Sequence, residues 1–247
     1  MIFPFIFLDC FGCVYIKRKV PPFNELEKRW FISFSEQVSV SLKLLNLYIE
    51  EKRIILSYIK AFSNILSQHV PTSHIHHKSL AKLIKALGEA LYLNEIEIKS
   101  LTFASLLHDA GKIDLPEELL KKQSSLTDDE YRAIMSHPKK GVDLIKDLSS
   151  LKPVIPIILH HHERYDGKGY PSSLKKEKIP LGSRILAILD AFDAMFFGRP
   201  YKEKVGMEVI EQELKKQRGH QFDPKIVDVF LKILKRKGIR KYLNSLR

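Results

Sequence analysis

Cysteine is scarce in this chain, because its 247 residues include only Cys10 and Cys13. Their Cys-x-x-Cys spacing occurs in zinc ribbons, but a ribbon needs a second pair of thiols, which the sequence does not contain. The same scarcity argues against a secreted fold that depends on disulfides. Both cysteines lie in an apolar, strand-like run, so we expect buried thiols with a packing role.

Long apolar runs are also lacking. Residues 1–16 are strongly apolar, but Asp9 interrupts them and no basic residue precedes them. The run is shorter than the roughly 20 residues that a membrane-spanning helix needs, and it does not have the layout of a signal peptide. We therefore expect a cytoplasmic protein and no membrane partner.

Acidic residues are outnumbered by basic ones, 29 against 41, which gives a formal net charge of +12. This balance favours an anionic partner such as a nucleic acid, an acidic membrane or a phosphorylated small molecule. The lysines are spread along the chain, with a local run at Lys235-Arg236-Lys237 and Arg240-Lys241. We interpret this run as solvated surface, and because no nucleic-acid motif accompanies it we expect no nucleic-acid partner.

The first 70 residues have a pattern of their own. Residues 11–16 are aromatic and β-branched, which predicts a strand, and Pro21-Pro22 ends it. A helix is predicted to begin near Asn24 and to end near His69. From Val38 a series with alternating steps of three and four runs through the apolar residues Leu45, Tyr48, Ile55, Ile59, Phe62 and Leu66, and Ser41 and Lys52 occupy its two polar positions. Two interpretations stay open: a helix packed on its own domain, or a parallel helix pair that joins two protomers.

Histidine and aspartate residues form a series of clusters in the rest of the chain. The clusters are His76, His108-Asp109, His137, His161-His162 and Asp190. Neutral imidazoles and carboxylates are the ligands that bind Fe, Mn and Zn in proteins. Helical periodicity separates the clusters, and Thr127 with Glu130 matches a capping box at a helix start. The pattern therefore predicts a multinuclear metal centre inside a helical bundle.

The clusters belong to a longer series of motifs that resembles the HD-GYP domain, a subfamily of the HD metal-dependent phosphohydrolases. The resemblance covers roughly residues 69–230. Its motifs are His108-Asp109-x-Gly111-Lys112-Ile113, Leu126-Thr127-x-x-Glu130, His137-Pro138-x-x-Gly141, His161-His162-Glu163-Arg164-x-Asp166-Gly167-x-Gly169-Tyr170-Pro171, Ile179-Pro180-Leu181, Arg184-Ile185, Asp190-x-x-Asp193-Ala194, Arg199-Pro200-Tyr201 and Phe222-Asp223-Pro224. Chance could produce one of them, but not all of them in order.

The resemblance implies an all-α bundle of about seven helices that hydrolyses cyclic di-GMP at a centre of two or three divalent metals. Iron or manganese is expected, and such ligands also accept zinc. Hydrolysis through a hydroxide that bridges the metals would give pGpG, with GMP as a further product. Carried over residue by residue, the metal ligands are His76, His108, Asp109, His137, His161, His162 and Asp190.

The resemblance also assigns other roles. Asp109 would bridge two metals, and Lys112 would offset the charge of the scissile phosphate. Tyr170, Arg199 and Lys202 would help to hold the dinucleotide. In relatives with three metals a glutamate lies one helical turn before the first histidine ligand. Thr72 occupies that position here, so we expect two metals.

The N-terminal strand, the Pro-Pro break and the following helix resemble the last strand and final helix of a GAF sensory domain. This gives three expected segments: a GAF-like remnant at residues 1–48, a helical linker and possible coiled coil at 49–68, and the HD-GYP domain at 69–247. The linker would form a homodimer through its helix. A diguanylate cyclase is a further candidate partner for such a domain.

Two other classes of function stay open from the sequence. One is a non-catalytic receptor that binds cyclic di-GMP or a partner protein, which loss of ligand residues would have favoured. The other is an HD hydrolase that acts on a different nucleotide, which the Gly169-Tyr170-Pro171 loop argues against.

Overall fold

The computed structural model describes residues 2–7, 10–69, 77–122, 124–198 and 203–246. These residues divide into two compact units, 1–58 and 59–247. Each unit is described by itself. None of the helices in the described ranges combines the length and the apolar character needed to cross a bilayer.

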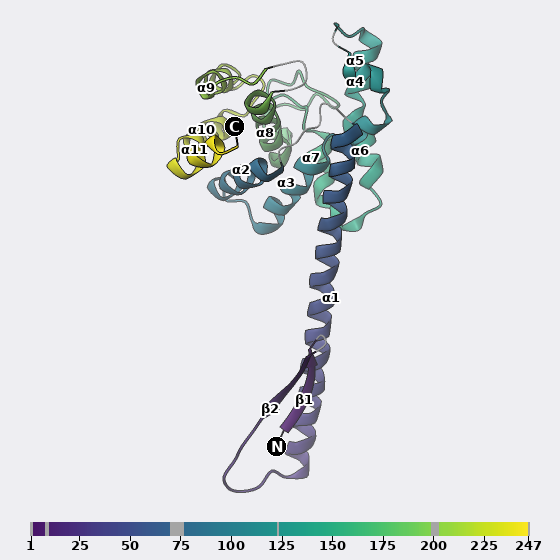
Figure 1. Cartoon of the computed structure of the whole chain (residues 1–247), viewed down its shortest axis with the longest axis vertical. Coiled ribbons are helices and arrows are strands. Elements are labelled where there is room, and N and C mark those ends of the chain that lie inside the picture. The colour runs from purple at the N-terminus through teal and green to yellow at the C-terminus, as the bar shows by residue number, and fades with distance from the viewer. Residues whose placement is uncertain (1, 8–9, 70–76, 123, 199–202, 247) are drawn as a thin grey trace. The chain divides into compact units, whose positions relative to one another are not determined.

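The first unit contains a β-hairpin and most of one long helix (Figure 1). Strand β1 (Ile2–Phe7) pairs antiparallel with β2 (Cys10–Tyr15), with Ile2 opposite Tyr15. Helix α1 spans Glu25–His69. Its start is capped as predicted, because the backbone N–H of Glu27 donates to Asn24 Oδ1 and the Glu27 carboxylate accepts from the N–H of Asn24.

The expectation of buried thiols is wrong for Cys13, which is exposed. An isolated two-stranded hairpin has two faces and too little material to cover both of them. An apolar strand sequence therefore did not guarantee burial. The side chain of Cys10 lies outside the described residues.

The second unit is all-α, as expected. Its longer helices are α2 (His77–Ala90), α3 (Glu95–Leu107), α5 (Asp128–Met135), α6 (His137–Ile145), α8 (Leu181–Phe197), α9 (Met207–Lys216), α10 (Pro224–Leu234) and α11 (Lys237–Asn244). Shorter helical segments connect them: η1 (Ala110–Asp114), α4 (Glu117–Lys121), η2 (Ser149–Val154), α7 (Ile155–Leu159) and η3 (Lys176–Lys178). These short segments come in addition to the longer helices, of which about seven were expected.

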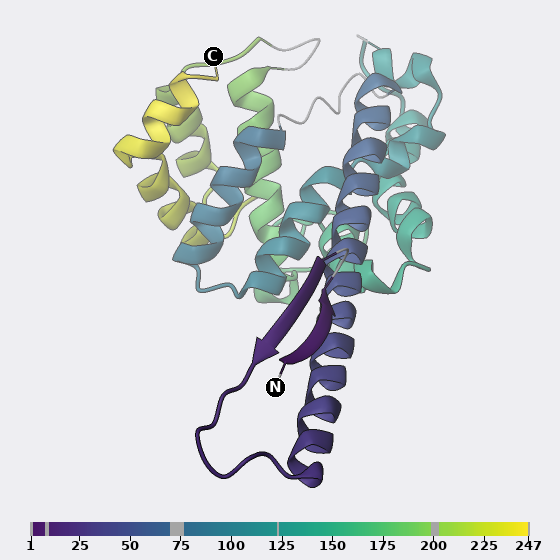
Figure 2. The same ribbon diagram turned by 60° about the horizontal axis from the view of Figure 1, so that its bottom comes forward.

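Helix α8 is the central element of this unit. It contacts α2, α3, α7, α9 and α10, and Figure 2 shows it running beside α2. A helix that is apolar on most of its faces must be covered on most sides, and α8 has eight buried residues along its length. Phe192 stacks on Phe196 at 5.2 Å between ring centroids and meets the ring edge of Phe230 of α10 at 5.4 Å. Each such fully buried ring stabilises the fold by about 1.5–3 kcal/mol.

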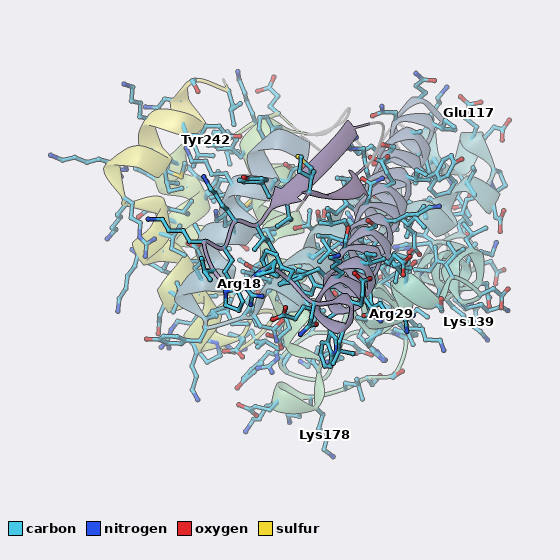
Figure 3. All side chains as sticks on the ribbon, turned by 90° about the horizontal axis from the view of Figure 1, so that it is seen from below. Arg18, Arg29, Glu117, Lys139, Lys178 and Tyr242 are labelled. Carbon is cyan, nitrogen blue, oxygen red and sulfur yellow. The ribbon has the colours of Figure 1, made fainter. Side chains whose placement is uncertain are left out.

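The apolar face of α2 is buried in the same core, with Leu83, Ile84 and Leu87 fully inaccessible to solvent. The cationic side chains of the local C-terminal run lie outside this core. Lys235, Arg236, Lys237, Arg240 and Lys241 are all exposed, as expected for a solvated surface. Figure 3 shows Lys139 and Lys178 extending away from the ribbon of the same unit.

Candidate metal centre

Three predicted ligands lie just beyond the C-terminal ends of three helices. His108 directly follows α3, and His137 and His161 each lie two residues beyond the ends of α5 and α7. The last carbonyl groups of an α-helix lack intrahelical partners. Each imidazole Nδ1 satisfies one of them three residues earlier: His108 with Ser105 O at 3.0 Å, His137 with Ile134 O at 2.7 Å, and His161 with Ile158 O at 2.6 Å.

These bonds decide which nitrogen is free to bind a metal. A carbonyl oxygen can only accept, so each Nδ1 carries the proton and each Nε2 keeps its lone pair. A second hydrogen bond of this kind orients a histidine ligand and sets its tautomer in metal sites. The three helix ends therefore present three oriented donor atoms.

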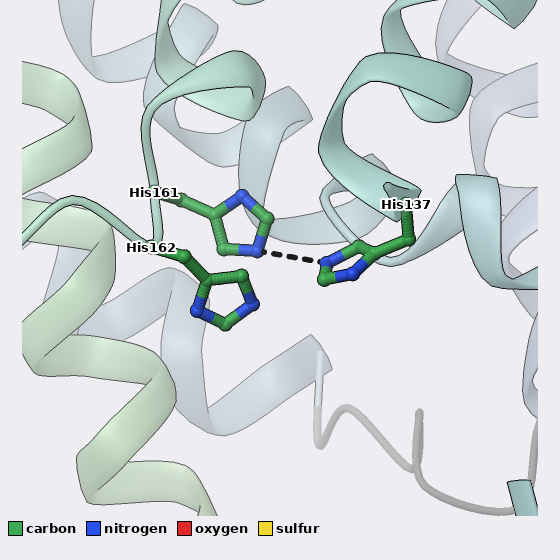
Figure 4. A group of neighbouring side chains, drawn as sticks. All are labelled: His137, His161 and His162. Atoms are coloured by element: carbon green, nitrogen blue, oxygen red, sulfur yellow. Dashed lines mark hydrogen bonds between the residues drawn. The ribbon is translucent and has the colours of Figure 1, made fainter. Parts of the chain in front are cut away.

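The donor atoms converge. His137 Nε2 and His161 Nε2 lie 3.4 Å apart, and the His162 ring lies next to both (Figure 4). Two triads have donor atoms within 4.8 Å of one another: His137, His161 and His162, and His108, Asp109 and His161. Ligands of one ion with bonds of about 2.1 Å lie roughly 3–4 Å apart. The donor set and its spacing thus fit divalent transition metals.

Asp109 lies between the histidines. Its Oδ1 is 3.8 Å from His108 Nε2 and 3.6 Å from His137 Nε2. Asp190, from the middle of α8, places its Oδ1 3.8 Å from the same nitrogen of His108. The buried Lys112 lies 2.8 Å from the Asp109 carboxylate. One carboxylate therefore reaches donors of both triads and is paired with a cation.

Burial keeps most of the imidazoles neutral. It lowers the pKa of His137 to about 4 and of His162 to about 3, and it holds the pKa of His161 well below its usual range. Burial also lowers the pKa of His108, but the carboxylates of Asp109 and Asp190 outweigh it, and the net shift is upward. For Asp109 burial raises the pKa, and Lys112 with the neighbouring histidines lowers it well below the ordinary value. Near pH 7 His137, His161 and His162 are thus neutral imidazoles beside the ionised Asp109 carboxylate, the protonation states that metals require.

A close backbone approach brings Asp109 to His137. A Cβ atom placed on Gly111 would lie 2.1 Å from the carbonyl oxygen of His137 and 2.5 Å from the nitrogen of Gly141. Only a residue without a side chain allows η1 to lie this close to α6. There is therefore a steric reason for a glycine two residues after Asp109 and for another four residues after His137.

Comparison with known proteins agrees with this geometry. A model of the HD domain family matches residues 60–226, more than half of the chain. The chain belongs to the HD domain family.

Two curated relatives of this HD domain carry informative names. The cyclic di-GMP phosphodiesterase response regulator RpfG of Xanthomonas campestris is 43% identical over 148 residues, which cover 59% of this chain and 39% of that protein. A cyclic di-GMP phosphodiesterase of Thermotoga maritima is 35% identical over 175 residues, which cover 70% of this chain and 48% of that protein. This chain therefore spans less than half the length of either relative.

A solved structure shares the fold. The cyclic GMP-AMP specific phosphodiesterase V-cGAP3 of V. cholerae superposes with a TM-score of 0.60 at 22% identity, over 75% of this chain and 50% of that one. This likeness concerns the HD domain architecture alone.

The loop that follows the His161-His162 pair is fixed by Glu163. The buried carboxylate of Glu163 accepts the backbone N–H groups of Ser172 at 2.7 Å and Leu174 at 3.0 Å. The loop places the Tyr170 ring on His162, with 4.9 Å between the ring centroids, and burial raises the pKa of the Tyr170 hydroxyl. Glu163 thus orders the loop of this HD domain, which agrees with a supporting role rather than a metal-binding one.

Not every predicted site residue is placed. His76, Thr72, Arg199 and Lys202 lie outside the described residues. The other predicted ligands, His108, Asp109, His137, His161, His162 and Asp190, are brought together, with Lys112 and Tyr170 beside them.

Sequence reasoning missed one wall of the HD domain site. A cavity of about 330 Å³ is lined by His161, His162 and Asp190, and also by Glu213 of α9 and by Gln217, the C-cap of that helix. These two residues form no motif, so no sequence pattern pointed to them. Their only signal was a spacing of four residues, which puts them on one face of a helix.

Proposed function

We propose that this chain is an HD-GYP phosphodiesterase that hydrolyses cyclic di-GMP to pGpG, with GMP as a further product. The observation that carries the proposal is the convergence of His108, Asp109, His137 and His161 donor atoms within one buried cluster. The names of the two curated relatives supply the substrate, and the Gly167–Pro171 segment beside His162 supports the subfamily.

The metals would be held by His108, Asp109, His137, His161, His162 and Asp190, with His76 as the remaining proposed ligand. Two ions of iron or manganese are proposed, and zinc is an acceptable substitute for these ligands. When bound, such ions polarise a phosphodiester and lower the pKa of water to near neutrality.

Lys112 and Asp109 have linked roles in this proposal. Lys112 is buried with its Nζ on the Asp109 carboxylate, so a charge-balanced pair exists before substrate arrives. An incoming phosphodiester brings a second anion to the same amino group. Lys112 would then offset the charge that builds up on the phosphate oxygens during attack. Tyr170, packed on His162, is a proposed substrate contact together with Arg199 and Lys202.

We further propose that the chain is organised as a GAF-like remnant at residues 1–48, a helical linker at 49–68 and an HD-GYP domain at 69–247. The division into compact units near residue 58 and the start of the HD match at residue 60 support separate parts. A homodimer through α1 is part of this proposal. It is supported by exposed apolar side chains along the first unit, including Trp30, Leu44 and Leu47.

The decisive experiment is anaerobic turnover of cyclic di-GMP by purified protein reconstituted with Fe(II) or Mn(II), with the nucleotide products separated over time. Appearance of pGpG, with or without GMP, is the expected result. Elemental analysis of the same sample should give two metal ions per chain. Absence of any product from metal-loaded protein would contradict the proposed activity and favour a receptor.

A further inference from the structure

The cavity beside the metal cluster has two walls of different chemistry. One wall is the predicted centre, with His161, His162 and Asp190; the other includes Glu213, Gln217 and Gln221. At about 330 Å³ it lies at the lower end of the range for pockets that enclose small organic ligands. The second wall contains none of the predicted metal ligands, so the metal centre does not explain its polar groups.

The residues around this second wall are suited to a flat ring. Helix α8 contributes the small side chains of Ala187, Ala191 and Ala194 together with Met195, and the buried Phe222 adds an apolar surface. Helix α9 contributes Glu213, and Gln217 follows one turn later as the C-cap of this helix. Gln217 Nε2 donates to Glu213 Oε1 at 2.9 Å, which fixes the orientation of the carboxylate.

Unlike Asp190, Glu213 is not a proposed metal ligand, so a phosphate group placed beside its carboxylate would be repelled. Glu213 is therefore suited to a part of the substrate that offers N–H donors. Guanine presents two donors side by side on one edge, N1–H and N2–H₂, and a carboxylate can accept both. Adenine presents a lone pair at N1, which the carboxylate would repel.

We propose that this cavity binds a guanine base of the substrate, with Glu213 as the residue that selects guanine over adenine and Gln217 as the residue that orients Glu213. The proposal rests on the proposed function, because it assigns a base to the dinucleotide that the adjoining centre would hydrolyse. The Gln221 side chain, on the same wall, would be available to donate to the guanine O6.

Glu213→Gln tests the proposal with little change in side-chain volume. A glutamine offers one acceptor and one donor, the arrangement with which amide side chains bind adenine. We expect wild-type protein to prefer cyclic di-GMP to cyclic di-AMP in kcat/KM. The variant should lower kcat/KM for cyclic di-GMP by about tenfold or more, mainly through KM, and should shift the preference towards cyclic di-AMP. Glu208→Gln, an exposed change in the same helix, is the matched control and should leave the preference unaltered.

Calorimetric titration of GMP and AMP into the same proteins separates the two proposals. Preference of the wild type for GMP, lost in Glu213→Gln, would support the base site even if no dinucleotide were hydrolysed. Failure to hydrolyse cyclic di-GMP would then count against the proposed function alone. Equal affinity of the wild type for GMP and AMP would overturn the base site. An equal fall in the kcat/KM of Glu213→Gln for both dinucleotides would also overturn the base site, because it would mean that Glu213 supports the fold.

Discussion

The two units place their apolar side chains differently. In residues 1–58, Trp30, Phe34 and Leu44 expose 72%, 62% and 61% of their surface. In residues 59–247, Phe192, Phe230 and Leu83 are fully buried, and His108, Asp109, His137 and His161 of the metal cluster are buried as well. Exposed large apolar side chains in such number mark an interaction surface. The second unit therefore has its own core, whereas the first has an apolar surface that a partner could cover.

The apolar series from Val38 to Leu66 in α1 crosses this boundary. Its burial distinguishes in part between the two interpretations, a helix packed on its own domain and a helix pair that joins two protomers. Ile59 and Leu66, at its C-terminal end, are buried and belong to the second unit, whereas Leu45 and Tyr48 are exposed in the first. The C-terminal end thus agrees with a helix packed on its own domain. The N-terminal part keeps the features of a helix pair.

The largest expected effect is the loss of turnover when a ligand of the metal cluster is removed. His161 is common to both triads, so His161→Ala should remove metal from the site and lower turnover of cyclic di-GMP by at least about 10³-fold. Metal content, turnover and circular dichroism would be measured together. His220→Ala removes an exposed imidazole and is the control. Full activity in metal-replete His161→Ala protein would remove His161 from the centre.

The next effect concerns backbone packing. Gly111→Ala should lower the free energy of unfolding by about 3 kcal/mol or more, because the new methyl group would overlap backbone atoms that cannot turn aside. Gly238→Ala is a matched control in α11, where a Cβ would meet nothing within 4 Å and alanine is the better helix former. Denaturant unfolding should show loss of stability in the first variant and a slight gain in the second. Similar midpoints for both would contradict the close approach.

Acid should destabilise the metal-free second unit. The pKa values of His137 and His162, about 4 and about 3 in the folded protein, lie below the ordinary value of 6.5. Between pH 6.5 and 4 the unfolded chain therefore binds more protons, and stability falls as the pH falls. The raised pKa of His108 opposes this in part. We expect a loss on the order of 2 kcal/mol from each of these two imidazoles by pH 5, measured by urea unfolding of metal-free protein at pH 7 and pH 5. Equal stability at the two values would show that these imidazoles are not held neutral.

The smallest effect concerns the first unit. Leu44→Glu with Leu47→Glu should weaken a homodimer by about tenfold or more, because two charges replace apolar contacts. Lys43→Glu, an exposed charge reversal in the same stretch of α1, is the control. Sedimentation velocity over a range of concentrations would measure the change. A wild-type chain that stays monomeric at every concentration would remove the proposed dimer.

Much of the candidate site could be predicted because only a few residue types bind metal ions. His108, Asp109, His137 and His161 were identified from the sequence and are brought together in space. The choice of ligand nitrogen could not be predicted, because it depends on the Ser105, Ile134 and Ile158 carbonyl groups and on where three helices end. The second wall of the cavity was missed for a similar reason, since it depends on α9 lying beside α8.

The fold was predicted in the same uneven way. The starts of α1 and α5 were correct because capping boxes are local signals. The pairing of β1 with β2 was not predicted, because residues 1–16 contain no Asn-Gly or Asp-Gly dipeptide that would mark a two-residue hairpin. Pairing is a tertiary property, and one apolar run can conceal two strands.

The position of the three histidines just beyond helix ends has an electrostatic consequence. Peptide dipoles add along a helix and leave a partial negative charge, roughly half an elementary charge, at its C-terminus. Helices α3, α5 and α7 all end at the cluster, while α6 begins there with His137. Three negative helix ends therefore face one positive end, and their macrodipoles leave a net negative potential at this point. The site thus attracts cations through its backbone as well as through Asp109 and Asp190. Lys112 reaches into this field, and the same negative potential would draw divalent ions to the centre.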